Sequence, residues 1–309
     1  MSKIAFIYPG QGAQKVGMGR DFYEAFPCVQ ETYKQASQLL GIDLCALCFE
    51  ENTELDVTEY TQPAMVTTCI AISEVLIQQG VDPDVTAGLS LGEYTAIAVA
   101  GGMTKMDAIQ TVRQRGVFMQ HAVPLGVGAM SAVLGMKVED IEAVVSGIEG
   151  VSIANYNCPG QLVITGTHEG VEQASQELKE QGAKRILPLN VSGPFHSPLL
   201  ADAGKKLEQV LEEIQVGDLN IPYVTNVDAS KVINKQQIKE LLVKQITSPV
   251  LWEQSIRYLI ETGVDTFIEI GPGKTLAGFI KKIDKSVTIY NINTVQDLYD
   301  IVEKIKVKM

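Results

Sequence analysis

The sequence contains one pattern typical of a nucleophilic enzyme, a serine between two glycines at Gly88-Leu89-Ser90-Leu91-Gly92. A short apolar segment before it predicts a strand, and small residues after it predict a helix. The flanking glycines let the backbone turn sharply, so that the serine stands exposed at the helix N-terminus. The N–H of Leu91 can then face the oxyanion that develops when Ser90 attacks a carbonyl carbon. The pattern indicates acyl transfer through Ser90; the alternative is a glycine-rich turn with an incidental serine.

A nucleophilic serine needs a base, and the chain offers three histidines. His121 ends a predicted helix, where a cation at the C-terminus is a sufficient structural explanation. His168 begins another predicted helix and is interpreted as a surface residue. His196 lies in the loop 192–198, which two prolines stiffen immediately before a helix, and catalytic groups tend to lie on loops held by a rigid scaffold. We therefore predict that His196 pairs with Ser90; the alternative is a histidine that only caps the helix.

Two other glycine-rich segments fail as nucleotide-binding motifs. Gly10-Gln11-Gly12 begins a dinucleotide-type pattern, but the position of the third glycine is Lys15. Gly273-Lys274-Thr275 resembles the end of a phosphate-binding loop, but the required first glycine is Ile268. What remains is a tight turn directly after the first predicted strand. Its Gln11 N–H is a candidate second donor to an oxyanion.

Arg115 lies on the apolar face of a predicted helix. The other inward positions of that helix are Ala108, Val112 and Met119. A buried arginine costs several kcal/mol unless a counter-charge meets it. The counter-charge could be a carboxylate of the substrate, held by the guanidinium fork. The alternative is that Arg113 and Arg115 are both solvated, or paired with a structural carboxylate.

Composition excludes several classes of function. The 309 residues include 25 Lys and Arg against 37 Asp and Glu, which gives a net charge of −12 and disfavours nucleic-acid binding. The longest uncharged stretch, 116–136, is broken by Pro124 and polar residues, so it is a poor membrane span. The N-terminus lacks the pattern of a signal peptide. We expect a cytoplasmic protein that binds neither membrane nor nucleic acid.

The five cysteines do not indicate a disulfide scaffold. Cys45 and Cys48 form a C-x-x-C pattern, but no second pair completes a zinc site and the flanking residues predict a helix. Nothing in the sequence calls for a metal or a redox cofactor.

Strand, turn and helix alternate along most of the chain, which favours an α/β fold with a parallel sheet. The expected strands are 4–8, 84–87, 221–226 and 266–270, and the expected helices are 22–40, 63–79, 94–100, 107–120 and 199–214, with two more before the last strand. The middle of the chain predicts strand 128–135, helix 138–146, strands 151–155 and 161–166, helix 169–181 and strand 184–189. This β-α-β-β-α-β order is ferredoxin-like. We therefore expect a small subdomain at 124–189, inserted into a large domain formed by 1–123 and 190–309.

Seven segments spread in order over the chain resemble the malonyl-CoA:acyl carrier protein transacylases, the malonyl-loading enzymes of type II fatty acid synthesis. They are PGQGAQ at 9–14, GLSLGEYTA at 88–96, RQRGVFMQ at 113–120, ANYNCPGQLVITG at 154–166, VSGPFHSPLL at 191–200, QITSPVLW at 245–252 and IEIGPGKTL at 268–276. Several motifs in the right order are more specific than any single one. Leu89 departs from the pattern, since many relatives carry histidine before the nucleophile, and this difference concerns details of the pocket. The resemblance implies an α/β-hydrolase-like parallel sheet with helices on both faces.

The resemblance also implies a role for each candidate residue. Ser90 is the acyl-accepting nucleophile, and His196 is first its general base and then the acid for the leaving thiol. The N–H groups of Gln11 and Leu91 form the oxyanion hole, and Arg115 binds the free carboxylate of the malonyl group.

Four further residues are implied by the same resemblance. Gln245 holds the His196 ring through its amide or its main-chain carbonyl. Met119, Asn155 and Phe195 line the acyl pocket.

The implied reaction is a ping-pong transfer of malonyl from malonyl-CoA to the phosphopantetheine thiol of acyl carrier protein, without a cofactor. We expect a monomer. Because carrier proteins are typically acidic and this chain carries −12, docking requires a local basic patch. Candidates are Lys184 with Arg185, Lys281 with Lys282, and Lys274.

Three alternatives stay open at this point. A trans-acting acyltransferase of a polyketide pathway would share the same chemistry. A serine esterase would use water as acceptor but gives a carboxylate-binding arginine no role. A carrier-binding module with a vestigial site would have no reason to keep Ser90, His196, Arg115 and Gln11 together.

Overall fold

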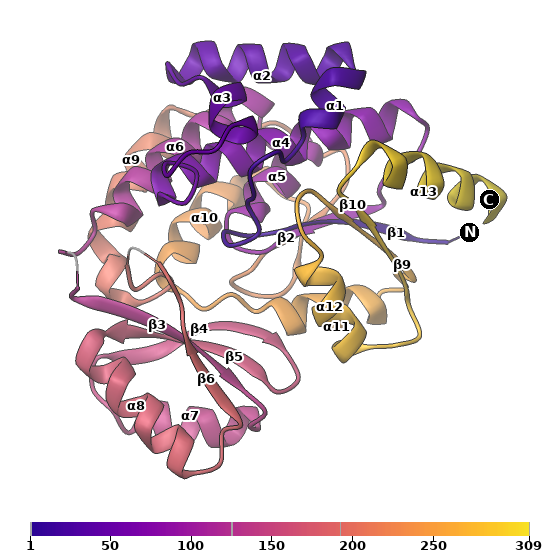
Figure 1. The fold of residues 1–309 in the computed structure, drawn as a ribbon. Coiled ribbons are helices and arrows are strands. Elements are labelled where there is room, and N and C mark those ends of the chain that lie inside the picture. The colour runs from indigo at the N-terminus through magenta and orange to yellow at the C-terminus, as the bar shows by residue number, and fades with distance from the viewer. Residues whose placement is uncertain (1, 125, 192, 309) are drawn as a thin grey trace.

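The chain folds into two sheets with helices packed around them, as the computed structural model shows (Figure 1). The structure describes residues 2–124, 126–191 and 193–308. The larger sheet contains β1 (Ile4–Tyr8), β2 (Val85–Gly88), β7 (Tyr223–Val224), β8 (Lys231–Val232), β9 (Thr266–Ile270) and β10 (Thr288–Ile292). The smaller sheet contains β3 (Gly128–Leu134), β4 (Val151–Cys158), β5 (Gln161–Thr167) and β6 (Arg185–Pro188). The expected α/β fold class is confirmed.

The larger sheet has the order β10-β9-β1-β2-β7-β8 and is parallel except for its edge strand β8. Strand β1 lies inside this sheet, and all five of its residues are buried. Its side chains alternate between the faces: Phe6 and Tyr8 join one apolar cluster, and Ala5 and Ile7 join another. A continuous apolar strand is typical of a parallel sheet that is covered on both faces.

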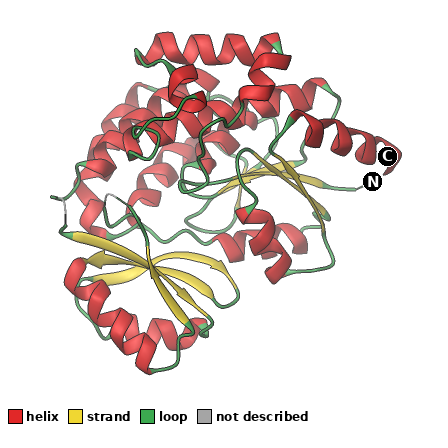
Figure 2. Ribbon diagram, viewed as in Figure 1, coloured by secondary structure: helices red, strands yellow, loops and turns green. Residues whose placement is uncertain are grey.

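Helices cover both faces of the larger sheet (Figures 1 and 2). One layer contains α1 (Arg20–Ala25), α2 (Pro27–Leu40), α3 (Leu44–Phe49), α4 (Thr58–Gln78), α5 (Gly92–Val99), α6 (Lys105–Gln120), α9 (Ala201–Glu213), α10 (Ile238–Thr247) and α13 (Val295–Lys308). The opposite face carries α11 (Trp252–Glu261) and α12 (Thr275–Ile283). Among the longest helices, α4 is buried along most of its length, because it packs against the sheet and is covered by its helical neighbours.

The smaller sheet is antiparallel, with the order β4-β5-β3-β6, and α7 (Val138–Ser146) and α8 (His168–Glu180) cover its outer face. This is the strand order of a ferredoxin-like unit. The other face of the sheet packs on the large domain, since Met130, Ala132, Ala154 and Val163 belong to the main apolar cluster. The sheet spans residues 128–188; the predicted subdomain limits of 124 and 189 stay a prediction.

A short segment around Val250 attaches the small sheet to the large domain. Val250 donates its N–H to the carbonyl of Ala154 at 2.8 Å and accepts the N–H of Tyr156 at 2.9 Å, so it extends β4 by an isolated parallel bridge. This bridge fixes β4 against the large domain, next to Asn155.

Prolines explain two differences from the sequence-based prediction. The helix expected over 22–40 is broken at Phe26, because Pro27 starts a new helix at its first position. Helix α4 begins at Thr58 rather than at Pro63, which instead lies inside it. A proline there removes the N–H that would bond to the Glu59 carbonyl, and Arg113 Nη1 donates to that oxygen at 2.7 Å.

Other elements were shorter than predicted or not predicted. The strand expected over 221–226 is reduced to Tyr223–Val224, and β8, α12, β10 and α13 were not predicted. Cys45 and Cys48 lie on α3, as the flanking residues predict, and all five cysteines are free thiols. Within the described ranges, no helix is long and apolar enough to cross a bilayer, and no cluster of acidic, cysteine or histidine side chains could hold a metal ion.

A matched pair of helical glycines tests the packing of α6 on α4. A Cβ on Gly116 would lie 2.8 Å from the Glu59 Cα, whereas a Cβ on Gly278 of α12 would meet nothing within 4 Å. Gly116→Ala should therefore lower the free energy of unfolding by about 1–3 kcal/mol through overpacking. Gly278→Ala should raise it by about 0.5–1 kcal/mol through helix propensity. Urea denaturation measures both, and equal effects of the two substitutions would contradict the packing argument.

Candidate active site

Ser90 lies at the turn between β2 and α5, in the left-handed conformation with φ of 54°. The turn is tight enough to require both flanking glycines. A Cβ on Gly88 would lie 2.0 Å from the carbonyl carbon of Gly92, and a Cβ on Gly92 would lie 2.4 Å from the Tyr8 carbonyl oxygen. A non-glycine residue at positive φ is strained, and such strain is typical of a site where the backbone must present one side chain.

Asn226 stabilises this turn from the loop after β7. Its Oδ1 accepts the N–H of Ser90 at 2.7 Å, and its Nδ2 donates to the Gly88 carbonyl at 2.7 Å. The side chain is buried, so both ends of the amide are satisfied by the turn it holds. The sequence analysis missed this residue, because nothing in the local pattern around 226 indicates a partner 136 positions away.

His196 is placed against Ser90 by the proline-bracketed loop. Its backbone is also left-handed, with φ of 58°. The ring Nε2 lies 2.8 Å from Ser90 Oγ, and Nδ1 lies 2.9 Å from the main-chain carbonyl oxygen of Gln245. A carbonyl can only accept, so Nδ1 carries the proton and Nε2 is free to accept from the serine hydroxyl. Burial, together with the nearby charge of Arg115, lowers the pKa of His196 to about 4, so the ring is neutral at pH 7.

Arg115 lies beneath the serine and is 1% exposed. Its Nη2 donates to Ser90 Oγ at 3.0 Å and to Gln245 Oε1 at 2.9 Å, and its Nη1 donates to Gln62 Oε1 at 2.9 Å. The Tyr94 ring lies 5.5 Å from the guanidinium carbon. Burial lowers the pKa of Arg115.

The Arg115 guanidinium has only neutral hydrogen-bond partners. In the part of the chain that the structure describes, no carboxylate forms an ion pair with it, and its buried Nε has no partner. A buried cation whose hydrogen-bond partners are all neutral is costly, and an incoming anion would reduce that cost. By contrast, Arg113 on the same helix forms an ion pair with Glu59 at 2.6 Å.

Gln245 and Glu93 complete the buried network. Gln245 Nε2 donates to Glu93 Oε2 at 2.6 Å and to the Ser90 carbonyl at 3.1 Å. Glu93 Oε2 also accepts the N–H of Asn226 at 3.2 Å. Burial raises the pKa of Glu93 to about 7. The sequence analysis placed Glu93 and Gln62 in no role.

Two main-chain donors, the N–H groups of Leu91 and Gln11, are the candidates for an oxyanion hole. Leu91 is the residue before α5, and Gln11 follows β1 in the Pro9–Gly12 turn. Neither of their N–H groups has a hydrogen-bond acceptor among the described residues. The Gln11 side chain is itself held, because its Nε2 donates to Thr58 Oγ1 at 3.0 Å. Both donors are therefore available to an oxyanion.

A cavity of about 370 Å³ opens over the serine and histidine. Its lining includes Gln11, Leu89, Ser90, Met130, Asn155, Phe195 and His196. A second cavity of about 230 Å³ shares Gln11, Leu89 and Asn155 with the first and extends toward Gln161 and Phe279. Of the three residues expected in the acyl pocket, Asn155 and Phe195 line the first cavity. Met119 does not: it is buried behind Gln62, whose Nε2 lies 3.8 Å from the Met119 sulfur.

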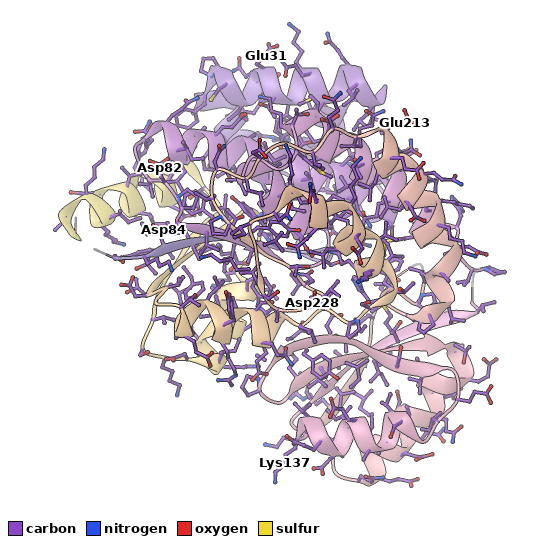
Figure 3. All side chains as sticks on the ribbon, turned by 180° about the vertical axis from the view of Figure 1, so that it is seen from behind. Glu31, Asp82, Asp84, Lys137, Glu213 and Asp228 are labelled. Atoms are coloured by element: carbon purple, nitrogen blue, oxygen red, sulfur yellow. The ribbon has the colours of Figure 1, made fainter. Side chains whose placement is uncertain are left out.

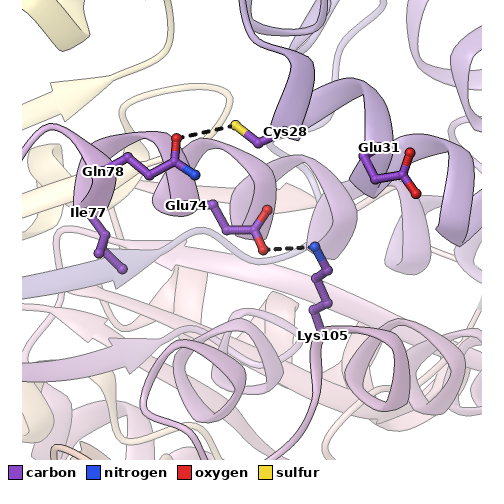
Figure 4. Close-up of a pocket in the computed structure, with 6 residues that line it drawn as sticks. All are labelled: Cys28, Glu31, Glu74, Ile77, Gln78 and Lys105. Carbon is purple, nitrogen blue, oxygen red and sulfur yellow. Dashed lines mark hydrogen bonds and ion pairs between the residues drawn. The ribbon is translucent and has the colours of Figure 1, made fainter.

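The remaining histidines lie outside this constellation. His121 is the residue that ends α6, and His168 begins α8 with an exposed side chain. Another hollow, between α2, α4 and the start of α6, has charged walls (Figure 4). In this hollow Lys105 pairs with Glu74 at 2.9 Å, and the lining contains none of the residues described above.

The geometry supports nucleophilic attack by Ser90 on the carbonyl carbon of an acyl group that also carries a carboxylate. The serine oxygen accepts from Arg115, so its own proton points to Nε2 of His196. The N–H groups of Gln11 and Leu91 have no acceptor among the described residues, and the buried Arg115 guanidinium contacts the serine oxygen, so both could stabilise negative charge on a bound acyl group. The arrangement needs no metal to perform acyl transfer.

Comparisons with known proteins agree with this chemistry. Residues 5–298 match the acyl transferase domain family. The malonyl CoA-acyl carrier protein transacylase of Bacillus subtilis is 48% identical over 304 residues, which cover 96% of each chain. The crystal structure of the transacylase of the same name from Clostridium perfringens superimposes with a TM-score of 0.96 at 43% identity, covering 99% of this chain and 98% of that one. A malonyl-transacylase solved in complex with its type II PKS acyl-carrier protein gives a TM-score of 0.95 at 40% identity, covering 98% of this chain and 100% of that one. The chain therefore belongs to the acyl transferase family, among its malonyl CoA-acyl carrier protein transacylases.

Proposed function

We propose that the chain transfers malonyl from malonyl-CoA to the phosphopantetheine thiol of acyl carrier protein, and that the malonyl-carrier product supplies fatty acid synthesis. The observation that carries this proposal is the buried Arg115 guanidinium, which lacks a carboxylate partner and donates to the hydroxyl of the serine that His196 activates. A substrate that brings its own carboxylate satisfies this charge, whereas an acetyl group leaves it unpaired.

In the first half-reaction, Ser90 Oγ attacks the thioester carbon of malonyl-CoA while its proton passes to Nε2 of His196. The resulting oxyanion accepts the N–H groups of Leu91 and Gln11. The intermediate collapses as the carbon–sulfur bond breaks, and His196 returns the proton to the coenzyme A sulfur. Malonyl-serine remains, with its free carboxylate on Arg115.

The second half-reaction repeats these steps with the carrier. The phosphopantetheine thiol gives its proton to His196 and attacks the serine ester. The ester bond breaks, Ser90 regains the proton, and malonyl leaves as a thioester of the carrier. The main-chain carbonyl of Gln245 holds the histidine in the tautomer that both halves need.

The Gln245 carbonyl takes the place that a buried aspartate has in a Ser-His-Asp triad. A neutral acceptor stabilises imidazolium less than a carboxylate does, which agrees with the low pKa of His196. Asn155, Phe195 and the nearby Met130 form the walls against which the acyl group rests.

The docking surface for the carrier is a further part of the proposal. The candidate basic residues Lys184, Arg185, Lys274, Lys281 and Lys282 are all exposed. Lys282 donates to Gln161, which lines the second cavity, so the α12 pair is connected to a wall of that cavity. The acidic side chains Glu31, Asp82, Asp84, Glu213 and Asp228 all lie on the large domain (Figure 3). We expect the protein to act as a cytoplasmic monomer.

A second candidate is malonyl loading of a polyketide carrier. It is favoured by the 40% identical malonyl-transacylase that was solved with a type II PKS carrier protein. The chemistry is the same, and only the acceptor differs.

The proposal predicts a covalent intermediate. Intact mass after mixing with malonyl-CoA should show one malonyl group, which disappears when phosphopantetheinylated carrier protein is added. Ser90→Ala should show no adduct. No adduct with any acyl-CoA would refute acyl transfer, and labelling by methylmalonyl-CoA but not malonyl-CoA would favour a polyketide extender role.

Arg115→Ala should separate malonyl from acetyl transfer. Breaking a buried charge pair should lower kcat/KM for malonyl-CoA by about 100-fold or more, while acetyl-CoA, which makes no such pair, falls far less. The matched control is Arg113→Ala on the same helix, which should leave the malonyl-to-acetyl ratio unchanged within about twofold. An equal loss for both substrates would contradict the assignment of Arg115.

The lowered pKa of His196 predicts that the reaction rate of Ser90 falls only at unusually low pH. The base works only when it is deprotonated, so a lower pKa extends activity to lower pH. Labelling of Ser90 by an uncharged sulfonyl fluoride should be constant from about pH 8 to about pH 5 and should halve near pH 4. Stopped-flow pH jumps, checked by circular dichroism, measure this rate on the folded protein. A midpoint near the ordinary histidine value of 6.5 would contradict a buried, neutral base.

A further inference from the structure

Glu93 is a buried carboxylate that the reaction described above does not use. It is 0% exposed and lies on the first turn of α5, three residues after Ser90. Its Oε1 has no hydrogen-bond partner among the described residues, while Oε2 accepts from Gln245 and Asn226. Burying a carboxylate with half of its acceptor capacity unused is costly, so a structural role alone explains it poorly.

The contacts of Glu93 lead to Arg115 through one side chain. Gln245 Nε2 donates to Glu93 at 2.6 Å, and Gln245 Oε1 accepts from Arg115 Nη2 at 2.9 Å. One end of a side-chain amide donates hydrogen bonds and the other end accepts them. The orientation of the Gln245 amide is therefore decided by the groups that face each end. A carboxylate can only accept. It therefore holds the NH₂ end of Gln245 toward itself and the carbonyl end toward the guanidinium.

We propose that Glu93 is a positioning residue for malonyl selection: through the Gln245 side chain it fixes the Arg115 guanidinium that receives the malonyl carboxylate. This inference rests on the function proposed above. The negative charge of Glu93 also faces the positive charge of Arg115 across the amide, without touching the place where a substrate carboxylate would bind. Direct pairing would instead have filled that place and excluded the substrate.

The proposal separates malonyl selection from the support of the general base. His196 is held by the main-chain carbonyl of Gln245, whereas Arg115 is held by its side chain. A change at Glu93 should therefore reach Arg115 and the acidic acyl group, and should affect the transfer of a neutral acyl group much less.

The test is Glu93→Gln, which keeps the size of the side chain but removes its charge and its acceptor-only character. At pH 8, above the pKa of about 7, kcat/KM for malonyl-CoA should fall about tenfold, as expected for the loss of one charge-assisted hydrogen bond. For acetyl-CoA the fall should be less than about threefold. Loading of Ser90 in single-turnover mixing measures both.

Two comparisons distinguish positioning from a structural effect. In an Arg115→Ala background, Glu93→Gln should change malonyl loading less than about twofold, because the group it positions is gone. The matched control is Glu269→Gln. Glu269 is also 0% exposed and accepts the N–H groups of Leu276 and Ala277 at the start of α12, and it takes no part in the hydrogen-bond network of Arg115, Gln245 and Ser90. This control should lower the melting temperature and leave the malonyl-to-acetyl ratio unchanged.

Equal losses for malonyl and acetyl in Glu93→Gln, no loss at all, or a full effect that persists without Arg115 would each overturn the proposal. If Glu93→Gln does not fold, Gln245→Met decides the question. It removes the side-chain link but keeps the main-chain carbonyl for His196, and an unchanged malonyl-to-acetyl ratio would overturn the proposal. A wild-type protein that loads neither acyl group would instead refute the proposed function.

Discussion

Burial of the Arg115 charge is the constraint on which the rest of the site depends. A guanidinium that is 1% exposed needs acceptors, and here they come from three separate parts of the chain: Gln62 of α4, Ser90 of the turn after β2, and Gln245 of α10. Each acceptor is neutral, so the charge is solvated by the protein without being neutralised. The elements that converge on Arg115 therefore hold its guanidinium in place in the absence of an anion, and such preorganisation would reduce the cost of binding the substrate carboxylate proposed above.

The positive charge of Arg115 also affects the reactivity of Ser90 and His196. Arg115 directs the Ser90 hydroxyl toward His196 by donating to its oxygen, and its positive charge adds to burial in lowering the pKa of the imidazole. Both Ser90 and His196 occupy left-handed backbone positions, which a non-glycine residue adopts only when its surroundings impose it. For Ser90 those surroundings are Asn226 and the two glycines; for His196 they are the flanking prolines and the Gln245 carbonyl.

The sequence was informative where the signal is local. The strand, the glycines and the helix around Ser90 are contiguous, and His196 followed by elimination among three histidines; the structure brings the two side chains to 2.8 Å. The partners of Arg115 could not be predicted from spacing, because Gln62 and Gln245 lie 53 and 130 positions away. The start of helix α4 was predicted at Pro63, just before the apolar positions that recur at helical spacing from Met65; in the structure the helix continues through Pro63, and Arg113 donates to the Glu59 carbonyl that the proline leaves without a helix hydrogen bond. The ferredoxin-like order was recognisable since its strands follow one another in short hairpins and crossovers.

The segment 245–250 links the chemistry to the shape of the cavity. At one end, the carbonyl of Gln245 holds His196; five residues later, Val250 pairs with β4 on both sides of Asn155. The small sheet thus reaches the site through the same stretch of chain that orients the base. Because packed elements of this kind move as units rather than deforming continuously, a displacement of the small sheet would shift the cavity wall and the histidine support together.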